Sequence, residues 1–193
     1  MQRNLKMNSC NSSFLSVEKD IELILKKLFL DSGEYSDTLK RLLVINAKDC
    51  LDNTENQVYK DAVNKASLNY LRKEGYIKLE PKISLKEHEE VKSYILISID
   101  NFVPNMENPQ YRDCTVHFDI ICHSDEWDIG NYRLRPIKIC GYIDGLLNNT
   151  KLTGIGTFQF LGCKELVLDD AFSGYTLSYA AIHGSDDQIA GEE

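Results

Sequence analysis

Alternation of apolar and polar residues over residues 111–123 constrains the fold of this chain more than any other feature. The apolar set is Cys114, Val116, Phe118, Ile120 and Cys122, and the polar set between them is Asp113, Thr115, His117 and Asp119. Because successive side chains of a strand point to opposite faces, the pattern predicts a strand with one buried face and one face in water. Such strands are typical of antiparallel sheets.

The segments on either side predict helices and further strands. Apolar residues recur at helical spacing in residues 16–33 and 53–74, and the run Leu42-Leu43-Val44-Ile45 between them fits either a helix or a strand. Ile77, Leu79 and Ile83 alternate around Pro81, which favours an edge or irregular strand. Residues 94–102 are rich in β-branched and aromatic side chains, and a turn over residues 103–110 makes a hairpin with residues 111–123.

An amphipathic helix and a second hairpin are expected after these strands. The helix begins near residues 133–135, with Pro136 in its first turn, and residues 157–168 and 174–183 form the hairpin. Its apolar stripe, which should face the sheet, consists of Tyr132, Pro136, Ile139, Ile143, Leu146 and Leu147.

Together these segments predict a single α+β domain. A mostly antiparallel sheet of two hairpins carries the amphipathic helix, with further helices N-terminal to it, in the order α-α-β-β-α-β-β. The domain spans residues 16–183, of which 16–75 form a helical part and 76–183 the sheet and its helix. We expect residues 1–15 and the acidic residues 184–193 to be flexible extensions.

Charge and hydropathy exclude several classes of protein. The net charge is −8, from 30 acidic and 22 basic residues. This balance argues against specific nucleic-acid binding, which needs a basic surface, and against docking on anionic lipid. The longest apolar run, residues 94–99, is far shorter than the roughly 20 residues of a membrane span. The polar first residues lack the apolar core of a signal peptide, so we expect folding in the cytoplasm and no membrane association.

A metal site is the first chemistry to consider, because Cys114, His117, Cys122 and His123 lie close in sequence. Neighbours in a strand, and residues three apart, point to opposite faces, whereas zinc needs converging ligands. We therefore predict no metal ligand. The six cysteines lack any Cys-x-x-Cys pair, so all are expected to be reduced thiols; they are Cys10, Cys50, Cys114, Cys122, Cys140 and Cys163.

Catalytic and cofactor motifs are incomplete. Glu90-Val91-Lys92 has the Glu-x-Lys spacing of restriction-type nucleases, but the preceding segment supplies only Glu80 as a further carboxylate. No Gly-x-Ser-x-Gly elbow occurs, and Gly154-Ile155-Gly156 precedes a strand rather than the helix that a phosphate loop requires. The histidines, which we expect at the surface, are His88, His117, His123 and His183. We predict no enzyme activity, no catalytic residue and no cofactor.

Aromatic residues in the last hairpin could stack on RNA bases, as in sheet-based RNA-binding domains. The candidates are Phe158, Phe160, Tyr175 and Tyr179. The basic residues that accompany such aromatics are missing, so we expect these rings to pack the sheet or a seam between subunits.

The order of elements over residues 93–184 resembles the tail-terminator and tail-completion proteins of tailed bacteriophages. The segment YRDCTVHFDIICHSDEWDIGNYRLRPIKICGYIDGLLNNTKLTG supplies a strand, a polar loop, a helix and a Gly turn. The segment FLGCKELVLDDAFSGYTLSYAAIH supplies the last strand pair.

The resemblance implies a structural virion protein without catalysis, which forms an oligomeric ring at the head-to-tail junction as a tail terminator or neck ring. Its partners would be on the order of six or twelve copies of itself, the portal or connector, and the tail tube. It would be assembled in the cytoplasm of the bacterial host. Two alternatives stay open: a cytosolic α+β adaptor that binds proteins, and a nuclease-like enzyme whose residues are not recognisable.

Overall fold

The computed structural model describes residues 14, 17–79, 90–107, 111–152 and 156–183. The predictions for Cys10, Glu80, Ile83 and His88, and for the two flexible extensions apart from Phe14, lie outside these residues.

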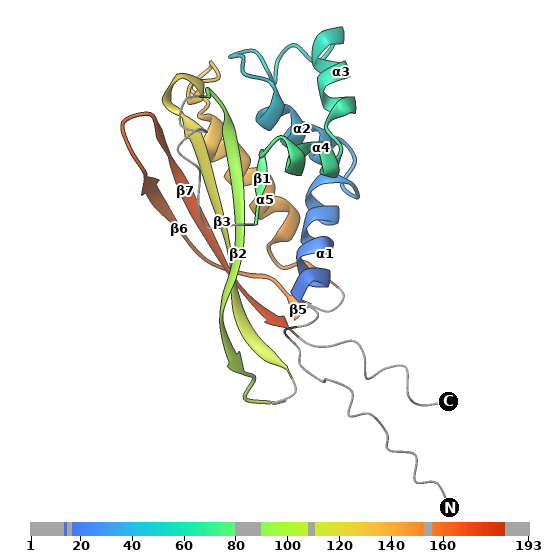
Figure 1. Ribbon diagram of the computed structural model, residues 1–193, viewed down its shortest axis with the longest axis vertical. Coiled ribbons are helices and arrows are strands. Elements are labelled where there is room, and N and C mark those ends of the chain that lie inside the picture. Colours follow the sequence, from blue (N-terminus) through green and yellow to red (C-terminus); the bar gives the residue numbers. More distant parts are fainter. Residues whose placement is uncertain (1–13, 15–16, 80–89, 108–110, 153–155, 184–193) are drawn as a thin grey trace, which may run out of the picture.

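One five-stranded sheet organises the chain, in the order β1-β2-β3-β7-β6 (Figure 1). Its strands are β1 (Ile77–Lys78), β2 (Ser93–Pro104), β3 (Arg112–His123), β6 (Gln159–Val167) and β7 (Phe172–His183). The four long strands pair antiparallel, and only β1 runs parallel to its neighbour β2. A separate two-stranded sheet joins β4 (Lys151–Leu152) to β5 (Gly156–Thr157). The predicted α+β class with a mainly antiparallel sheet is confirmed.

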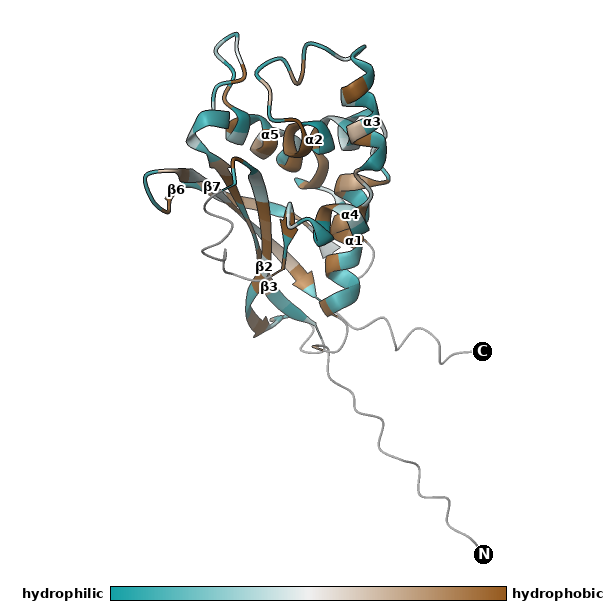
Figure 2. Ribbon diagram, turned by 45° about the horizontal axis from the view of Figure 1, so that its top comes forward, coloured by the Kyte–Doolittle hydropathy of each residue, from teal (hydrophilic) through white to brown (hydrophobic). Residues whose placement is uncertain are grey.

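The helices gather on one side of this sheet (Figures 1 and 2). They are α1 (Val17–Phe29), α2 (Glu34–Val44), α3 (Gln57–Lys65), α4 (Leu68–Lys73) and α5 (Arg135–Leu147). Within the described part of the chain, none has the length and apolar character that a membrane span requires.

Local hydrogen bonds explain where the helical predictions were wrong. The segment predicted as one helix over residues 53–74 is two helices, because the hydroxyl of Ser67 accepts a bond from the N–H of Tyr70 and starts a new helix. The ambiguous run beginning at Leu42 lies mostly in α2. α1 ends at Phe29, before the end of the predicted range 16–33, and Gly33, with a φ of 54°, directly precedes α2.

Strand β2 is longer than its sequence pattern indicates. It continues through Pro104 after a bulge between Asp100 and Val103, so the turn predicted to start at residue 103 starts at Asn105. A bulge allows an irregular segment to remain in the ladder, which the alternation of side chains does not reveal.

The core lies between β3 and α5, as the two apolar patterns predict. Val116, Phe118 and Ile120 on β3 are fully buried, as are Ile139 and Ile143 on α5. The helix begins at Arg135 with Pro136 in its first turn.

Tyr132 is a correction to the predicted stripe. It is fully exposed, and its φ of 60° places it in the turn before α5 rather than on the helix. The predicted apolar stripe of the helix therefore extended one turn too far toward the N-terminus.

Arg135 is a buried cation that joins three segments of the helix layer. Its guanidinium donates hydrogen bonds to the carbonyl oxygens of Leu42 (2.7 Å), Ile45 (2.9 Å), Ala47 (3.1 Å) and Glu126 (2.8 Å). The carboxylate of Glu126 lies 2.9 Å from it. Buried charges are tolerated only when paired and hydrogen-bonded in this way, so Arg135 holds the end of α2 against the start of α5.

We predict that Arg135→Met destabilises the protein by about 3–5 kcal/mol, because it leaves a buried carboxylate and several carbonyl oxygens without their donor. Urea unfolding measures the change. Arg133→Met is the matched control: Arg133 pairs with the half-exposed Asp52, and because solvent screens this pair its loss should destabilise the protein far less. Equal losses in the two variants would contradict the role given to Arg135.

We predict that Ile143→Asp prevents soluble folding, since it places an unpaired charge between α5 and β3. Ile137→Asp, on the exposed side of the same helix, should remain soluble and fold. Expression and thermal melting compare the two. A normal melting curve for Ile143→Asp would show that the buried stripe is misassigned.

Candidate assembly surface

Strand β6 is an open edge of the sheet that is exposed on both faces. It pairs with β7 on one side, and no other described strand pairs with it. Its exposed fractions reach 45% at Phe160, 59% at Leu161 and 66% at Val167. Long apolar edges are usually blunted by proline or charge because they pair readily with other chains. β6 contains no proline, and its only charges are the adjacent Lys164 and Glu165.

The position of α5 explains this exposure. α5 packs on β3 and β7, so β6 lies beyond the helix layer. The register with β7 assigns the two faces of β6: Phe160, Cys163, Glu165 and Val167 lie on the side of the helices. Lys164 and Leu166 lie on the opposite side, which we call the open face.

The open face carries a row of hydrogen-bonded polar side chains. His117 lies between Asp100 and Ser178, with Nε2 3.2 Å from the Asp100 carboxylate and Nδ1 2.8 Å from the Ser178 hydroxyl oxygen. The three residues occupy neighbouring strands β2, β3 and β7. They therefore tie the middle of the sheet together on the side that the helices leave uncovered.

The same three residue types form the relay of serine hydrolases, which makes catalysis worth testing. Acyl transfer also needs N–H groups directed at a developing oxyanion. Ser178 lies within a strand paired on both sides, with His117 opposite it on β3 and Gly162 opposite it on β6. The backbone N–H groups around it belong to the strand ladder. The geometry thus supplies a relay without an oxyanion site.

We predict that a fluorophosphonate probe does not label Ser178. The hydroxyl is held as a cross-strand hydrogen-bond partner, and nothing in the ladder stabilises the tetrahedral adduct. Intact-mass spectrometry of the native protein after incubation checks this, with Ser178→Ala as the control. Labelling that disappears in Ser178→Ala would establish a nucleophile and contradict the predicted absence of enzyme activity.

The residues weighed as metal ligands do not converge. Cys114 and Cys122 are buried on the helix side of β3, whereas His117 lies on the open face. His123 accepts a hydrogen bond from the N–H of Asp125 at the turn after β3. Within the described residues, no three His, Cys, Asp or Glu side chains are grouped in a way that could hold a metal.

Glu90 and Lys92, which have the Glu-x-Lys spacing, make contacts that stabilise the structure. The ammonium of Lys92 lies 3.5 Å from the Glu90 carboxylate and 4.2 Å from the centre of the Tyr76 ring. The ammonium thus serves an ion pair and a cation–π contact near the sheet edge. Glu80, the other carboxylate considered, lies outside the described residues.

One sequence expectation about a side chain was wrong. His183 was expected at the surface, but it is fully buried and paired with the buried Asp20 of α1. A histidine near a polar end of the chain carries no sequence signal of such a distant partner. The aromatic set is divided: Phe158 and Tyr179 are in the core, whereas Phe160 is exposed on β6.

Burial suppresses ionisation of the thiols. The five described cysteines are free, and burial raises the pKa of Cys114 and of Cys122 to about 12. Cys163 on β6 is exposed. Because the thiolate is the reactive form, reactivity should follow exposure.

We predict six free thiols by mass spectrometry without reductant, and an unchanged melting temperature in the presence of a chelator. In the folded protein, alkylation at pH 8 should modify Cys163 long before Cys114 or Cys122, since both buried thiols remain protonated. A melting temperature that falls by many degrees with the chelator would instead indicate a structural metal.

Comparison with known proteins gives the chain a family. The YomW family model matches residues 36–181, which include most of α2, all of α3 to α5 and nearly all of the sheet. The name of this family suggests an origin in a Bacillus phage gene. No curated protein matches.

Among solved structures, a crystal structure from Akkermansia muciniphila aligns with 91% of this chain and 98% of its own. The identity is 10% and the TM-score 0.28, too low to carry an argument about fold or function. The family match covers well over half of the sequence and all the elements around the edge strand. The chain belongs to the YomW family.

Proposed function

We propose that this chain is a structural virion protein that assembles into a ring at the head-to-tail junction of a tailed phage, as a tail terminator or neck ring. The observation that carries the proposal is the open edge strand β6, which is apolar, long and exposed on both faces. The chain's membership of a family with a phage-derived name and its resemblance to tail-terminator proteins support the same function.

The directions of the edge strands are compatible with a head-to-tail ring. β2 and β6 are the outermost long strands, and they run in opposite directions because three antiparallel pairings separate them. On its outer side, β2 has a described partner only at Ile95 and Leu96. Copies related by rotation about an axis along the strands therefore bring the β6 edge of one copy to the β1–β2 edge of the next. Such head-to-tail contacts close into rings when the rotation allows it.

The open face would serve as the wall of the channel. It carries Asp100, Asp113 and Asp119, in a chain of net charge −8. A wall of this charge repels the phosphate backbone of passing DNA and keeps DNA from binding to the ring. The ring would hold on the order of six or twelve copies and contact the portal or connector on one side and the tail tube on the other.

We predict that electron microscopy of phage particles, with this protein tagged at its C-terminus, finds it only at the neck. Particles lacking the protein should separate into full heads and free tails. Density elsewhere in the virion, or normal particles without the protein, would contradict the proposed function.

A further inference from the structure

Two adjoining cavities lie at the edge of the sheet opposite β6, each with a volume of about 570 Å³. Asn69, Arg72 and Leu79 line both, so the cavities form one groove between α1, α4 and β1, which we call the edge groove. The edge groove and β6 thus occupy opposite ends of the same sheet (Figure 1).

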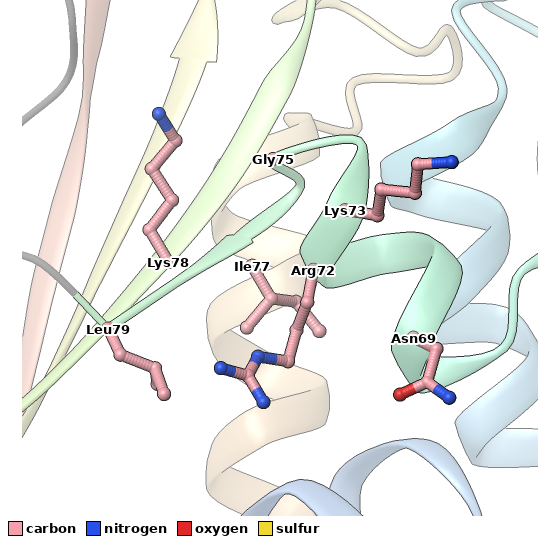
Figure 3. A pocket seen from close by; sticks show the side chains of 7 residues that line it. All are labelled: Asn69, Arg72, Lys73, Gly75, Ile77, Lys78 and Leu79. Atoms are coloured by element: carbon pink, nitrogen blue, oxygen red, sulfur yellow. The ribbon is translucent and has the colours of Figure 1, made fainter.

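The edge groove has an apolar floor with charged residues around it. Four of these are basic and two acidic: Lys26, Arg72, Lys73 and Lys78, and Glu18 and Glu22. The apolar lining residues are Ile21, Leu25, Leu68, Ile77 and Leu79. Figure 3 shows Asn69, Arg72 and Lys73 of α4 among the side chains that line one of the cavities. No ion pair with another described residue engages Arg72, which is exposed on α4. Basic residues outnumber acidic ones in this lining, and Glu22 is already paired with Lys26. The edge groove therefore suits an apolar segment that carries a carboxylate.

We propose that the edge groove receives strand β6 of a second copy of this chain, with Glu165 of that copy paired to Arg72. The inference rests on the proposed ring and identifies the seam that closes it. β6 would add beside β1 as a further antiparallel strand, the mode of recognition in which main-chain bonds give affinity and side-chain pockets give specificity.

The directions of the strands and the face of β6 on which Glu165 lies both agree with this seam. β1 runs parallel to β2, and β6 runs opposite to β2, so β6 of a copy placed head to tail is antiparallel to β1. Glu165 lies on the helix side of β6, the side on which α4 carries Arg72. The two charges therefore meet on the same side of the joined sheet.

The apolar surfaces are complementary as well. Phe160 and Val167 share the helix side of β6 with Glu165, and both are exposed in the single chain. On docking they would cover Leu68 and Leu79 in the floor of the edge groove. Glu165 has no ion-pair partner among the described residues, so the contact satisfies a charge on each copy.

Charge exchange tests the seam in the full-length protein. Sedimentation velocity over a range of concentrations should show that Arg72→Glu and Glu165→Arg each raise the concentration needed for half-assembly about tenfold or more, because each places like charges together. The double variant should return to within about threefold of the wild type. Lys48→Glu makes the same charge change on an exposed lysine that lines neither cavity, and should assemble like the wild type.

Melting curves first establish that each variant is folded. Arg72→Ala and Glu165→Ala replace a charge-exchange variant that does not fold. Each outcome of the assembly experiment then decides a different point. Wild-type rings that persist in both single variants overturn the seam and leave the ring function standing. A stable two-fold dimer sensitive to Glu165→Arg alone shows that β6 pairs with itself. A wild-type chain that stays monomeric at every concentration and is absent from the phage neck overturns the ring function itself.

Discussion

The buried guanidinium of Arg135 determines how the helix layer sits on the sheet. It binds carbonyl oxygens at the end of α2 and in the loop that follows, and it starts α5. A cation without these partners could not remain inside the protein, so the two helices and Arg135 stabilise one another. The position of α5 follows from this contact, and it covers β3 and β7.

Because α5 covers β3 and β7, the last strand of the sheet remains outside the layer. β6 then keeps apolar side chains in water on both faces and an unpaired backbone edge. In a protein that functions as a monomer, this arrangement would be a liability for aggregation. In a subunit, the same exposure supplies the free energy of assembly. In the proposed seam, the edge groove on the opposite side of the sheet gives that surface a partner.

Sequence patterns predicted the elements in which burial follows a simple period. The alternation at Val116 and Phe118 and the spacing of Ile139 and Ile143 determined the core, since each buried side chain lies one strand or helix repeat from the next. The class of fold followed from these two faces. The break at Ser67 and the continuation of β2 past Val103 depend on one hydroxyl bond and one bulge, which leave no periodic signal.

The assembly surface was harder to predict, because β6 is exposed only where the helix layer does not cover the sheet. The sequence around Glu165 has the pattern of an ordinary hairpin strand. The exposure of this strand is apparent only once the position of α5 on the sheet is known. Arg72 lies about ninety residues earlier in the chain, so no local pattern relates the two. Asp20 and His183 illustrate the same limit inside the core, where a buried pair joins the two ends of the domain.

Amide hydrogen exchange across β6 tests most directly the claim that this uncovered edge drives assembly. In dilute protein, the outward-facing amides of residues 159–167 should exchange rapidly, as those of an open edge do. At concentrations where the chain assembles, the account predicts strong protection of the same amides and of those in β1, while β3 is protected throughout. Assembly that leaves β6 exchanging as fast as in the monomer would contradict it.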